Sequence, residues 1–295
     1  MRALLSSGMA AAFLLVGAAG AHAAPDRQPV RNYVALGDSY VSKPGIRGLD
    51  PDSPTCGRTD ENYPAAVAEG LGLSPGNGFT DVSCAASKTT ALTNPRDSIG
   101  QTVPPQLDAV TEDADLVTIS IGENNLDFFA TTVGTCIPID LMEGEGSPCR
   151  REGPIEQPIL TEQGFAQVRD SVHRDLTAAA NVIKGRAPNA RVFFVGYPQM
   201  FPVGKQCLDT KPMTVGDMAW IDERLRGVNA TIQQVAKETG QTYVDTYGPS
   251  VGHGLCSTGP AWESGLLTAN LLESQPLHLT PLGGQEIAKL ILAKV

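Results

Sequence analysis

Short apolar runs that alternate with longer helical patterns constrain the fold of this chain most strongly. Runs typical of buried strands lie at 33–36, 115–121, 191–195 and 242–244, with a weaker run at 79–84. Apolar residues at helical spacing lie at 62–71, 165–183, 214–238 and 280–293, and 107–109 is typical of a helix end. Strands separated by helices favour a parallel sheet covered on both faces. We therefore expect an α/β fold, a three-layer α/β/α sandwich around a central parallel sheet.

The first 23 residues have the features of an export signal. Arg2 supplies a positive start, residues 9–19 are apolar and uncharged, and Ala21-His22-Ala23 offers small residues for cleavage before Ala24. The apolar run is too short to cross roughly 30 Å of hydrocarbon. We expect a signal peptide at 1–23 and one secreted domain at 24–295, a monomer without stable membrane insertion.

The charge and the cysteines narrow the class of protein. A net charge of -10 argues against partners such as nucleic acid or anionic membrane surfaces. Six cysteines follow the signal, and an even number in an exported chain predicts disulfides. No two of them have the close spacing of a metal-binding pair. Sequence alone allows 15 pairings, and bridges between neighbours, each pinning a loop-rich interval, are our hypothesis: Cys56–Cys84, Cys136–Cys149 and Cys207–Cys256.

The carboxyl ends of parallel strands are where such sheets carry their chemistry. Three segments lie at predicted strand exits: 37–40, 84–88 and 122–127. Ser39 follows a strand and a glycine, which exposes a hydroxyl in a tight turn. Asn124 could present its side-chain amide to an oxyanion, helped by backbone N–H groups at Ser39 and in 84–86.

A serine nucleophile needs a base, and the four histidines can be ranked. His22 leaves with the signal. His173 has charged neighbours on a predicted helix, and His253 lies between two glycines in a predicted surface loop. His278 directly precedes the last helix and is the best candidate for the base.

Two other segments match functional motifs, but their sequence context does not support a function. Gly248-Pro249-Ser250-Val251-Gly252 fits G-x-S-x-G, but that motif requires a strand running into the serine and a helix after it. The prolines and glycines here favour a loop. Asn229-Ala230-Thr231 fits a glycosylation acceptor but lies inside a predicted helix, and we assign it no role.

The three strand-exit motifs resemble those of the GDSL, or SGNH, hydrolases. Gly37-Asp38-Ser39-Tyr40 resembles the first family block, Gly122-Glu123-Asn124-Asn125 the G-x-N-D block, and His278 the final His block. The blocks come in family order and span almost the whole mature chain. The placement of the six cysteines is similar to that in secreted actinobacterial lipases and esterases, which supports the sequential pairing.

The resemblance implies a flavodoxin-like SGNH fold and a role for each matched residue. Ser39 would be the nucleophile and would contribute its N–H to the oxyanion hole. Asn124 would donate its side-chain amide and Ala86, where the family usually has glycine, its backbone N–H. His278 would act as base and then acid. Asn125 replaces the usual aspartate and is interpreted as structural.

The largest departure concerns the acid of the triad. The family places an aspartate three residues before the histidine, where this chain has Gln275. Some secreted actinobacterial members orient the histidine through a backbone carbonyl. We therefore predict a Ser39–His278 dyad with the carbonyl of Gln275 as acceptor, and Glu273 as the alternative partner.

The resemblance predicts a secreted serine hydrolase that cleaves ester or lipid substrates through an acyl-enzyme, with no metal and no organic cofactor. A carbohydrate acetylesterase or a phospholipase of the same family is the alternative. A non-catalytic binding protein is a further alternative, since Gln275, Ala86 and Asn125 each depart from the family pattern. Loops 42–60 and 136–159 contain or adjoin cysteines and are expected to form walls around the site.

Overall fold

A parallel six-stranded sheet forms the centre of the molecule in the computed structural model, which describes residues 28–98, 100–150 and 157–295. The strands run in the order β2-β3-β1-β6-β7-β8, and every pair of neighbours is parallel. Their bounds are β1 (Tyr33–Gly37), β2 (Ser74–Pro75), β3 (Gly78–Asp81), β6 (Leu116–Ser120), β7 (Arg191–Val195) and β8 (Thr242–Val244). A separate antiparallel hairpin joins β4 (Arg96–Ser98) to β5 (Gln101–Val103).

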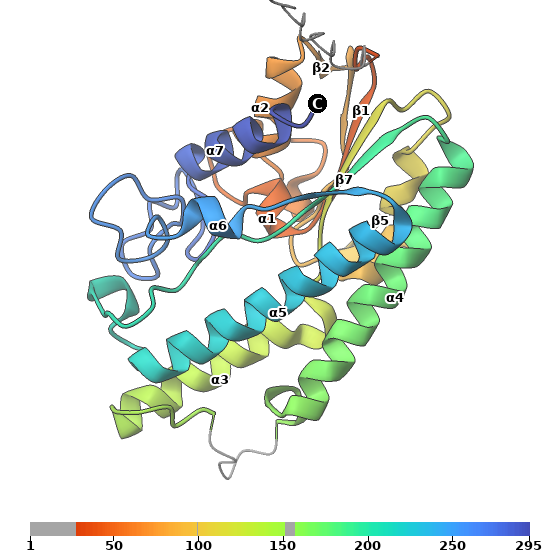
Figure 1. The fold of residues 1–295 in the computed structure, drawn as a ribbon. Coiled ribbons are helices and arrows are strands. Elements are labelled where there is room, and N and C mark those ends of the chain that lie inside the picture. The colour runs from red at the N-terminus through yellow and green to blue at the C-terminus, as the bar shows by residue number, and fades with distance from the viewer. Residues whose placement is uncertain (1–27, 99, 151–156) are drawn as a thin grey trace, which may run out of the picture.

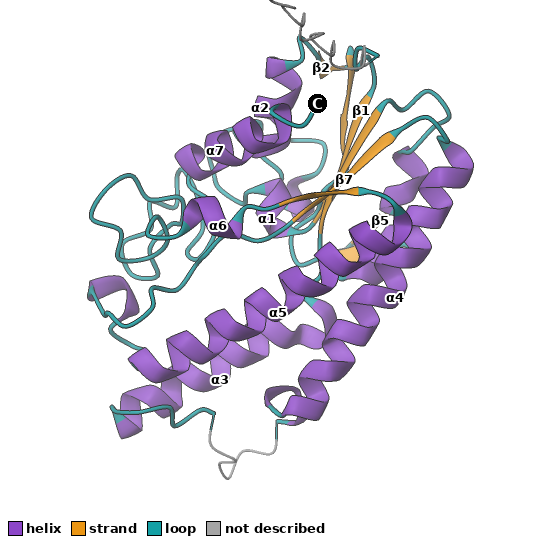
Figure 2. Ribbon diagram, viewed as in Figure 1, coloured by secondary structure: helices purple, strands orange, loops and turns teal. Residues whose placement is uncertain are grey.

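Helices cover both faces of the sheet, as Figures 1 and 2 show. The helices are α1 (Ser39–Ser42), α2 (Tyr63–Gly70), α3 (Phe128–Glu143), α4 (Glu162–Arg186), α5 (Val215–Thr239), α6 (Tyr247–Ser250) and α7 (Pro281–Leu292). The packed pair α2 and α7 lies on one face, and the pair α4 and α5 lies on the other. The predicted three-layer α/β/α sandwich is confirmed.

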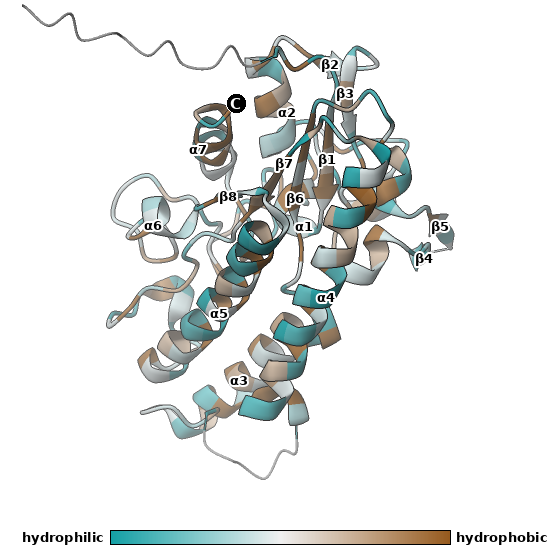
Figure 3. Cartoon of the chain, turned by 45° about the vertical axis from the view of Figure 1, so that its right-hand side comes forward, coloured by the Kyte–Doolittle hydropathy of each residue, from teal (hydrophilic) through white to brown (hydrophobic). Residues whose placement is uncertain are grey.

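Local sequence accounts for most of these elements. All residues of β1 and β6 are buried, as expected for strands covered on both faces. Figure 3 shows the central strands β1 and β7 largely in brown, the hydrophobic end of the scale. Side-chain oxygens cap the long helices: Asn62 accepts from Ala65 N at α2, and the hydroxyls of Thr161, Thr214 and Thr280 cap α4, α5 and α7.

Two segments differ from the sequence-based expectation. Residues 107–109 belong to a single 3₁₀ turn, Gln106–Ala109, rather than to a helix end. The helix α3 was not predicted, because Pro138 interrupts its sequence pattern and its start is unusual, with Leu126 and Asp127 at positive φ. Tertiary contacts compensate: Cys136 is disulfide-bonded, and Asp140 accepts a hydrogen bond from Thr214 N. The expected loop 136–159 therefore starts as helix.

The three disulfides join neighbours in sequence: Cys56–Cys84, Cys136–Cys149 and Cys207–Cys256. The sequential pairing is confirmed. In the described ranges, no helix combines the length and apolar character that crossing a bilayer requires. The predicted signal peptide at 1–23 lies outside these ranges.

Candidate active site

Ser39 lies at the exit of β1, in the tight turn that leads into α1. Gly37 ends the strand, and a Cβ there would lie 2.5 Å from the carbonyl oxygen of Ser120 and closer still to Val41, so only glycine fits. Asp38 caps α1, with Oδ1 accepting from Tyr40 N at 3.0 Å. Ser39 itself is the first residue of α1. The predicted strand–turn placement of Ser39 is present, but the residue is buried rather than exposed as expected, because the turn is packed under neighbouring elements.

Backbone hydrogen bonds connect this turn to both neighbouring strand exits. Asp38 N donates to Ser120 O at 3.1 Å, and Cys84 N donates to Gly37 O at 3.0 Å. The buried amide of Gln106 pairs with the same glycine: its Oε1 accepts from Gly37 N at 2.7 Å, and its Nε2 donates to Gly37 O at 2.8 Å. Gln106 was not predicted, because nothing in its local sequence indicates a partner 69 residues away.

The two predicted oxyanion donors beyond Ser39 lie on facing turns. Asn124 follows β6, and its Nδ2 donates to Ser87 O at 3.3 Å, which directs the amide towards the 84–87 turn. In that turn Ala86 is exposed and has a φ of 59°, the left-handed conformation that glycine adopts at least cost. The substitution of the family's glycine by Ala86 therefore keeps the glycine-like backbone.

Asn125, which stands where the family usually has aspartate, holds the turn after β6 in place. It is buried, its Oδ1 accepts from Thr89 N at 2.9 Å, and its Nδ2 donates to the hydroxyls of Thr89 and Ser171 at 2.6 and 2.8 Å. The amide of Asn125 both accepts from the backbone and donates to the two hydroxyls. An ionised carboxylate could only accept.

His278 lies beside Tyr40, the residue after Ser39: the two ring centroids are 5.8 Å apart. The Tyr40 hydroxyl lies 3.3 Å from Leu277 O, so the same side chain also contacts the peptide before His278. Ser264 N donates to His278 O at 2.8 Å and fastens the segment from its other side. Tyr40 and Leu277, 237 positions apart in sequence, are thus brought together.

The partner of the imidazole differs from the predicted one. His278 Nδ1 lies 2.8 Å from the carbonyl oxygen of Pro276, whereas the carbonyl of Gln275 accepts from the Ser274 hydroxyl at 3.2 Å. A backbone carbonyl is the acceptor as expected, but one residue further along the chain. Leu277, which separates Pro276 from His278, has a φ of 60°, in the left-handed region.

This contact sets the tautomer of His278, the predicted base. A carbonyl oxygen only accepts, so Nδ1 carries the hydrogen and Nε2 keeps its lone pair. Burial lowers the pKa of His278 below its ordinary 6.5, and the hydrogen bond to Pro276 partly offsets this shift. The alternative partner, Glu273, lies elsewhere: its carboxylate pairs with Arg47 at 3.7 Å.

Three buried carboxyl groups lie beneath the site. Desolvation raises the pKa of Asp38 to about 7, and burial raises the pKa of Glu123 and of Glu263 well above the ordinary range. Repulsion from Asp38 and Glu263 raises the pKa of Glu123 further. Like charges in one low-dielectric region are not all ionised together, so the three groups do not carry three negative charges at once.

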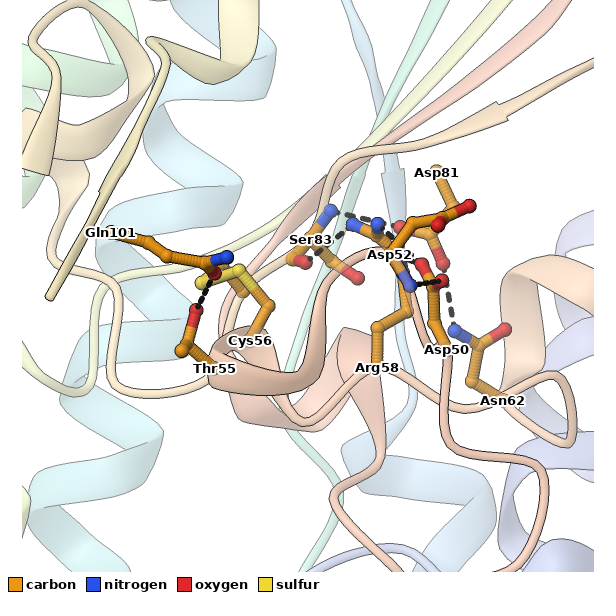
Figure 4. A network of polar contacts seen from close by, with 10 residues as sticks. Asp50, Asp52, Thr55, Cys56, Arg58, Asn62, Asp81, Ser83 and Gln101 are labelled. Carbon is orange, nitrogen blue, oxygen red and sulfur yellow. Dashed lines mark hydrogen bonds and ion pairs between the residues drawn. A yellow bond between two sulfur atoms is a disulfide. The ribbon is translucent and has the colours of Figure 1, made fainter. Parts of the chain in front are cut away.

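The loop 42–60 is held against the exit of β3, beside the Ala86 turn. The disulfide Cys56–Cys84 joins the two segments, and Ala85 N donates to Cys56 O at 2.8 Å. Figure 4 shows this region, with Thr55 Oγ1 donating to Gln101 Oε1 at 3.2 Å.

A polar network further attaches the loop 42–60 to the exit of β3 (Figure 4). Arg58 donates to Asp50 Oδ2 at 3.1 and 2.7 Å and to Ser83 O at 3.1 Å, so one guanidinium joins the loop to the strand exit. Asp81 accepts from Asn62 Nδ2 at 2.7 Å and from Ser83 N at 2.8 Å. The cysteine-bounded loop is thus fixed by several independent contacts.

The remaining candidates lie in other environments. Ser250 is buried at the end of α6, where its hydroxyl donates to Tyr247 O and accepts from Gln199 N at 2.7 Å. Strand β8 ends at Val244, so the strand that a nucleophile elbow requires does not reach Ser250. His173 pairs with Glu238 on the surface. His253 stacks on Trp262.

The chain matches the family that the sequence motifs resemble, and known proteins with similar sequences are lipases. The profile of the GDSL-like lipase/acylhydrolase family matches residues 35–285. The chain is 33% identical to Lipase 2 of Streptomyces coelicolor over 277 residues, which cover 92% of this chain and 88% of that protein. It is 30% identical to a lipase of Streptomyces rimosus, covering 84% of this chain and 82% of that protein.

Solved structures agree as well. Phospholipase A1 of Streptomyces albidoflavus has a TM-score of 0.71 and 25% identity, covering 90% of this chain and 98% of that chain. The extracellular lipase of Streptomyces rimosus has a TM-score of 0.66 and 26% identity with the same coverage. The chain therefore belongs to the GDSL-like lipase/acylhydrolase family, and it is a carboxylic ester hydrolase, a lipase or esterase of the GDSL type.

Proposed function

We propose that the ester is cleaved by a Ser39–His278 dyad through an acyl-enzyme on Ser39. The observation that carries the proposal is the contact of His278 Nδ1 with the carbonyl of Pro276, which leaves Nε2 as a proton acceptor beside the nucleophile turn. A backbone carbonyl orients the imidazole and stabilises the developing imidazolium, a task that a carboxylate performs in a triad.

In the first step, Ser39 Oγ bonds to the ester carbonyl carbon while its proton passes to His278 Nε2. The negative charge on the carbonyl oxygen is stabilised by three donors, the N–H groups of Ser39 and Ala86 and the amide of Asn124. The alcohol then leaves with the proton from His278. In the second half, a water gives its proton to His278 and attacks the acyl carbon, and the acid is released as the Ser39 hydroxyl is restored.

We further propose that the protein is secreted after cleavage near Ala23 and acts on acyl esters of lipids. Three disulfides suit an oxidising compartment. The relatives are described as lipases, one of them extracellular, and as a phospholipase A1. A phospholipid is therefore the favoured alternative to a simple acyl ester.

The test uses p-nitrophenyl esters of graded acyl length with the wild type and Ser39→Ala. We expect Ser39→Ala to lower kcat by about 10³-fold or more, and the wild type to prefer long acyl chains if it is a lipase. A fluorophosphonate should label the Ser39 peptide of the wild type. Unchanged turnover in Ser39→Ala, or labelling at Ser250, would refute the mechanism.

A further inference from the structure

The orientation of the nucleophile turn depends on the buried carboxylate of Asp38. Its Oδ1 accepts from Tyr40 N inside the turn, and its Oδ2 accepts from the hydroxyl of Tyr197 at 2.5 Å. Asp38 is fully buried, so these bonds act where water does not compete. The tyrosine comes from the exit of β7, a strand that contributes none of the expected catalytic groups.

The same tyrosine hydroxyl contacts the oxyanion turn. Glu123 N donates to Tyr197 Oη at 3.2 Å, and Glu123 is the residue directly before Asn124. One oxygen atom therefore donates to the turn that carries Ser39 and accepts from the turn that carries Asn124. The hydroxyl thus links Asp38 and Glu123, the residues directly before Ser39 and Asn124, without involving the substrate.

Tyr197 is itself held in one position. The side chain of Asn229, on α5, accepts from Tyr197 N and donates to Tyr197 O, both at 2.8 Å. The ring of Tyr197 is buried and packs edge-on against Tyr40, with centroids 5.2 Å apart. Such a side chain acts as a fixed support rather than as a mobile group. The buried amide of Asn229, in the Asn-Ala-Thr motif, is fully engaged in this contact.

We propose that Tyr197 is a positioning residue, which keeps the Ser39 turn and the Asn124 turn at the separation that acyl transfer needs. The inference rests on the proposed function, because it assumes that both turns act on the same substrate carbonyl. Rates of such reactions are sensitive to small displacements of the reacting groups. Tyr197 lies outside the three sequence blocks that indicate the family.

The first test is Tyr197→Phe, which removes the hydroxyl and keeps the ring. We expect kcat for a p-nitrophenyl ester to fall about 10- to 100-fold, with KM within about twofold, since the substrate-binding surface is unchanged. Tyr247→Phe is the matched control. It also removes a tyrosine–aspartate hydrogen bond, from Tyr247 Oη to Asp222 Oδ2 at 2.8 Å, but touches neither turn. Its kcat should match the wild type.

A second measurement separates positioning from loss of folded protein. The fraction of molecules that a fluorophosphonate labels at Ser39 gives kcat per reactive site. The inference requires a lower kcat per labelled site in Tyr197→Phe. A kcat that falls only in proportion to the labelled fraction would overturn it. If Tyr197→Phe does not fold, Asn229→Asp, which removes the donor to Tyr197 O, should lower kcat per labelled site in the same direction, and an unchanged value would overturn the inference.

A double-mutant cycle with Asn124→Ala tests the route of the effect. If Tyr197 acts partly by placing Asn124, the loss caused by Tyr197→Phe should be smaller in the Asn124→Ala background than in the wild type. Fully additive losses, or a Tyr197→Phe enzyme within twofold of the wild type, would contradict the inference. Failure of the dyad itself would show separately, as turnover retained by Ser39→Ala.

Discussion

The Nδ1 atom of His278 lies 2.8 Å from the carbonyl oxygen of Pro276, two residues earlier in the chain. The imidazole is therefore oriented by a carbonyl of its own loop rather than by a carboxylate side chain. This arrangement accounts for an active site in which the position usually held by the acid is occupied by Gln275. It also makes the pairing insensitive to most substitutions of side chains in 273–276.

The first prediction follows from this backbone contact. Glu273→Ala and Gln275→Ala should both retain kcat within about twofold, because neither removes the Pro276 carbonyl, whereas His278→Ala should lose about 10³-fold or more. The Glu273 carbonyl, which accepts from the buried Lys43 Nζ at 2.8 Å, is preserved in the alanine variant. His173→Ala serves as the control. A collapse of kcat in Glu273→Ala alone would show that a carboxylate orients the base.

The second prediction concerns the left-handed backbone of Ala86. An L-residue in this conformation carries a cost of about 1–2 kcal/mol that glycine avoids. Ala85 has no positive φ, so glycine there brings only its entropic cost of roughly 0.5–1 kcal/mol. We expect Ala86→Gly to have a free energy of unfolding about 1–2 kcal/mol above that of Ala85→Gly, with kcat unchanged because the backbone N–H remains. Urea denaturation checks the difference, and equal stabilities would contradict it.

The third prediction concerns stability against pH at the junction of α3 and α5. Asp140 is buried against Asp217, whose carboxylate accepts from Cys149 N at 2.8 Å. Burial, reinforced by Asp217, raises the pKa of Asp140 from 3.8 to about 7. The pKa of Asp140 is higher in the folded than in the unfolded state. Its contribution to the free energy of unfolding is therefore fully present below about pH 4 and is lost as the pH rises to about 7.

We therefore expect the Tm of the wild type to fall between pH 5 and pH 8, and the Tm of Asp140→Asn to fall less, because the amide stays neutral. Asp38, whose pKa is also raised to about 7, lowers the Tm over the same pH range, and this effect remains in Asp140→Asn. The control is Asp170→Asn on the exposed surface of α4. A pH slope of Asp140→Asn equal to that of the wild type would refute the assignment.

The sequence by itself indicated the elements whose patterns are local. β1, β6, β7 and β8 appear close to their predicted bounds, because strands buried on both faces are continuous apolar runs. Helices α2, α4, α5 and α7 are indicated by apolar spacing and by capping residues. The helix α3 escaped prediction, because Pro138 interrupts its sequence pattern and Asp140 stabilises it through Thr214, 74 residues away.

The same division applies to the site. The placement of Ser39, Asn124 and His278 was predictable, since each lies in a short motif at a strand exit or before a helix. The contacts of Gln106 with Gly37, of Tyr197 with Asp38 and of His278 with Pro276 were decided by the tertiary structure. The first joins the 3₁₀ turn Gln106–Ala109 to the end of β1, and the second joins the exits of β1 and β7. The third spans Leu277, whose φ is positive. Periodicity and motifs record which residues face the core, whereas these contacts depend on how the strand exits meet in space.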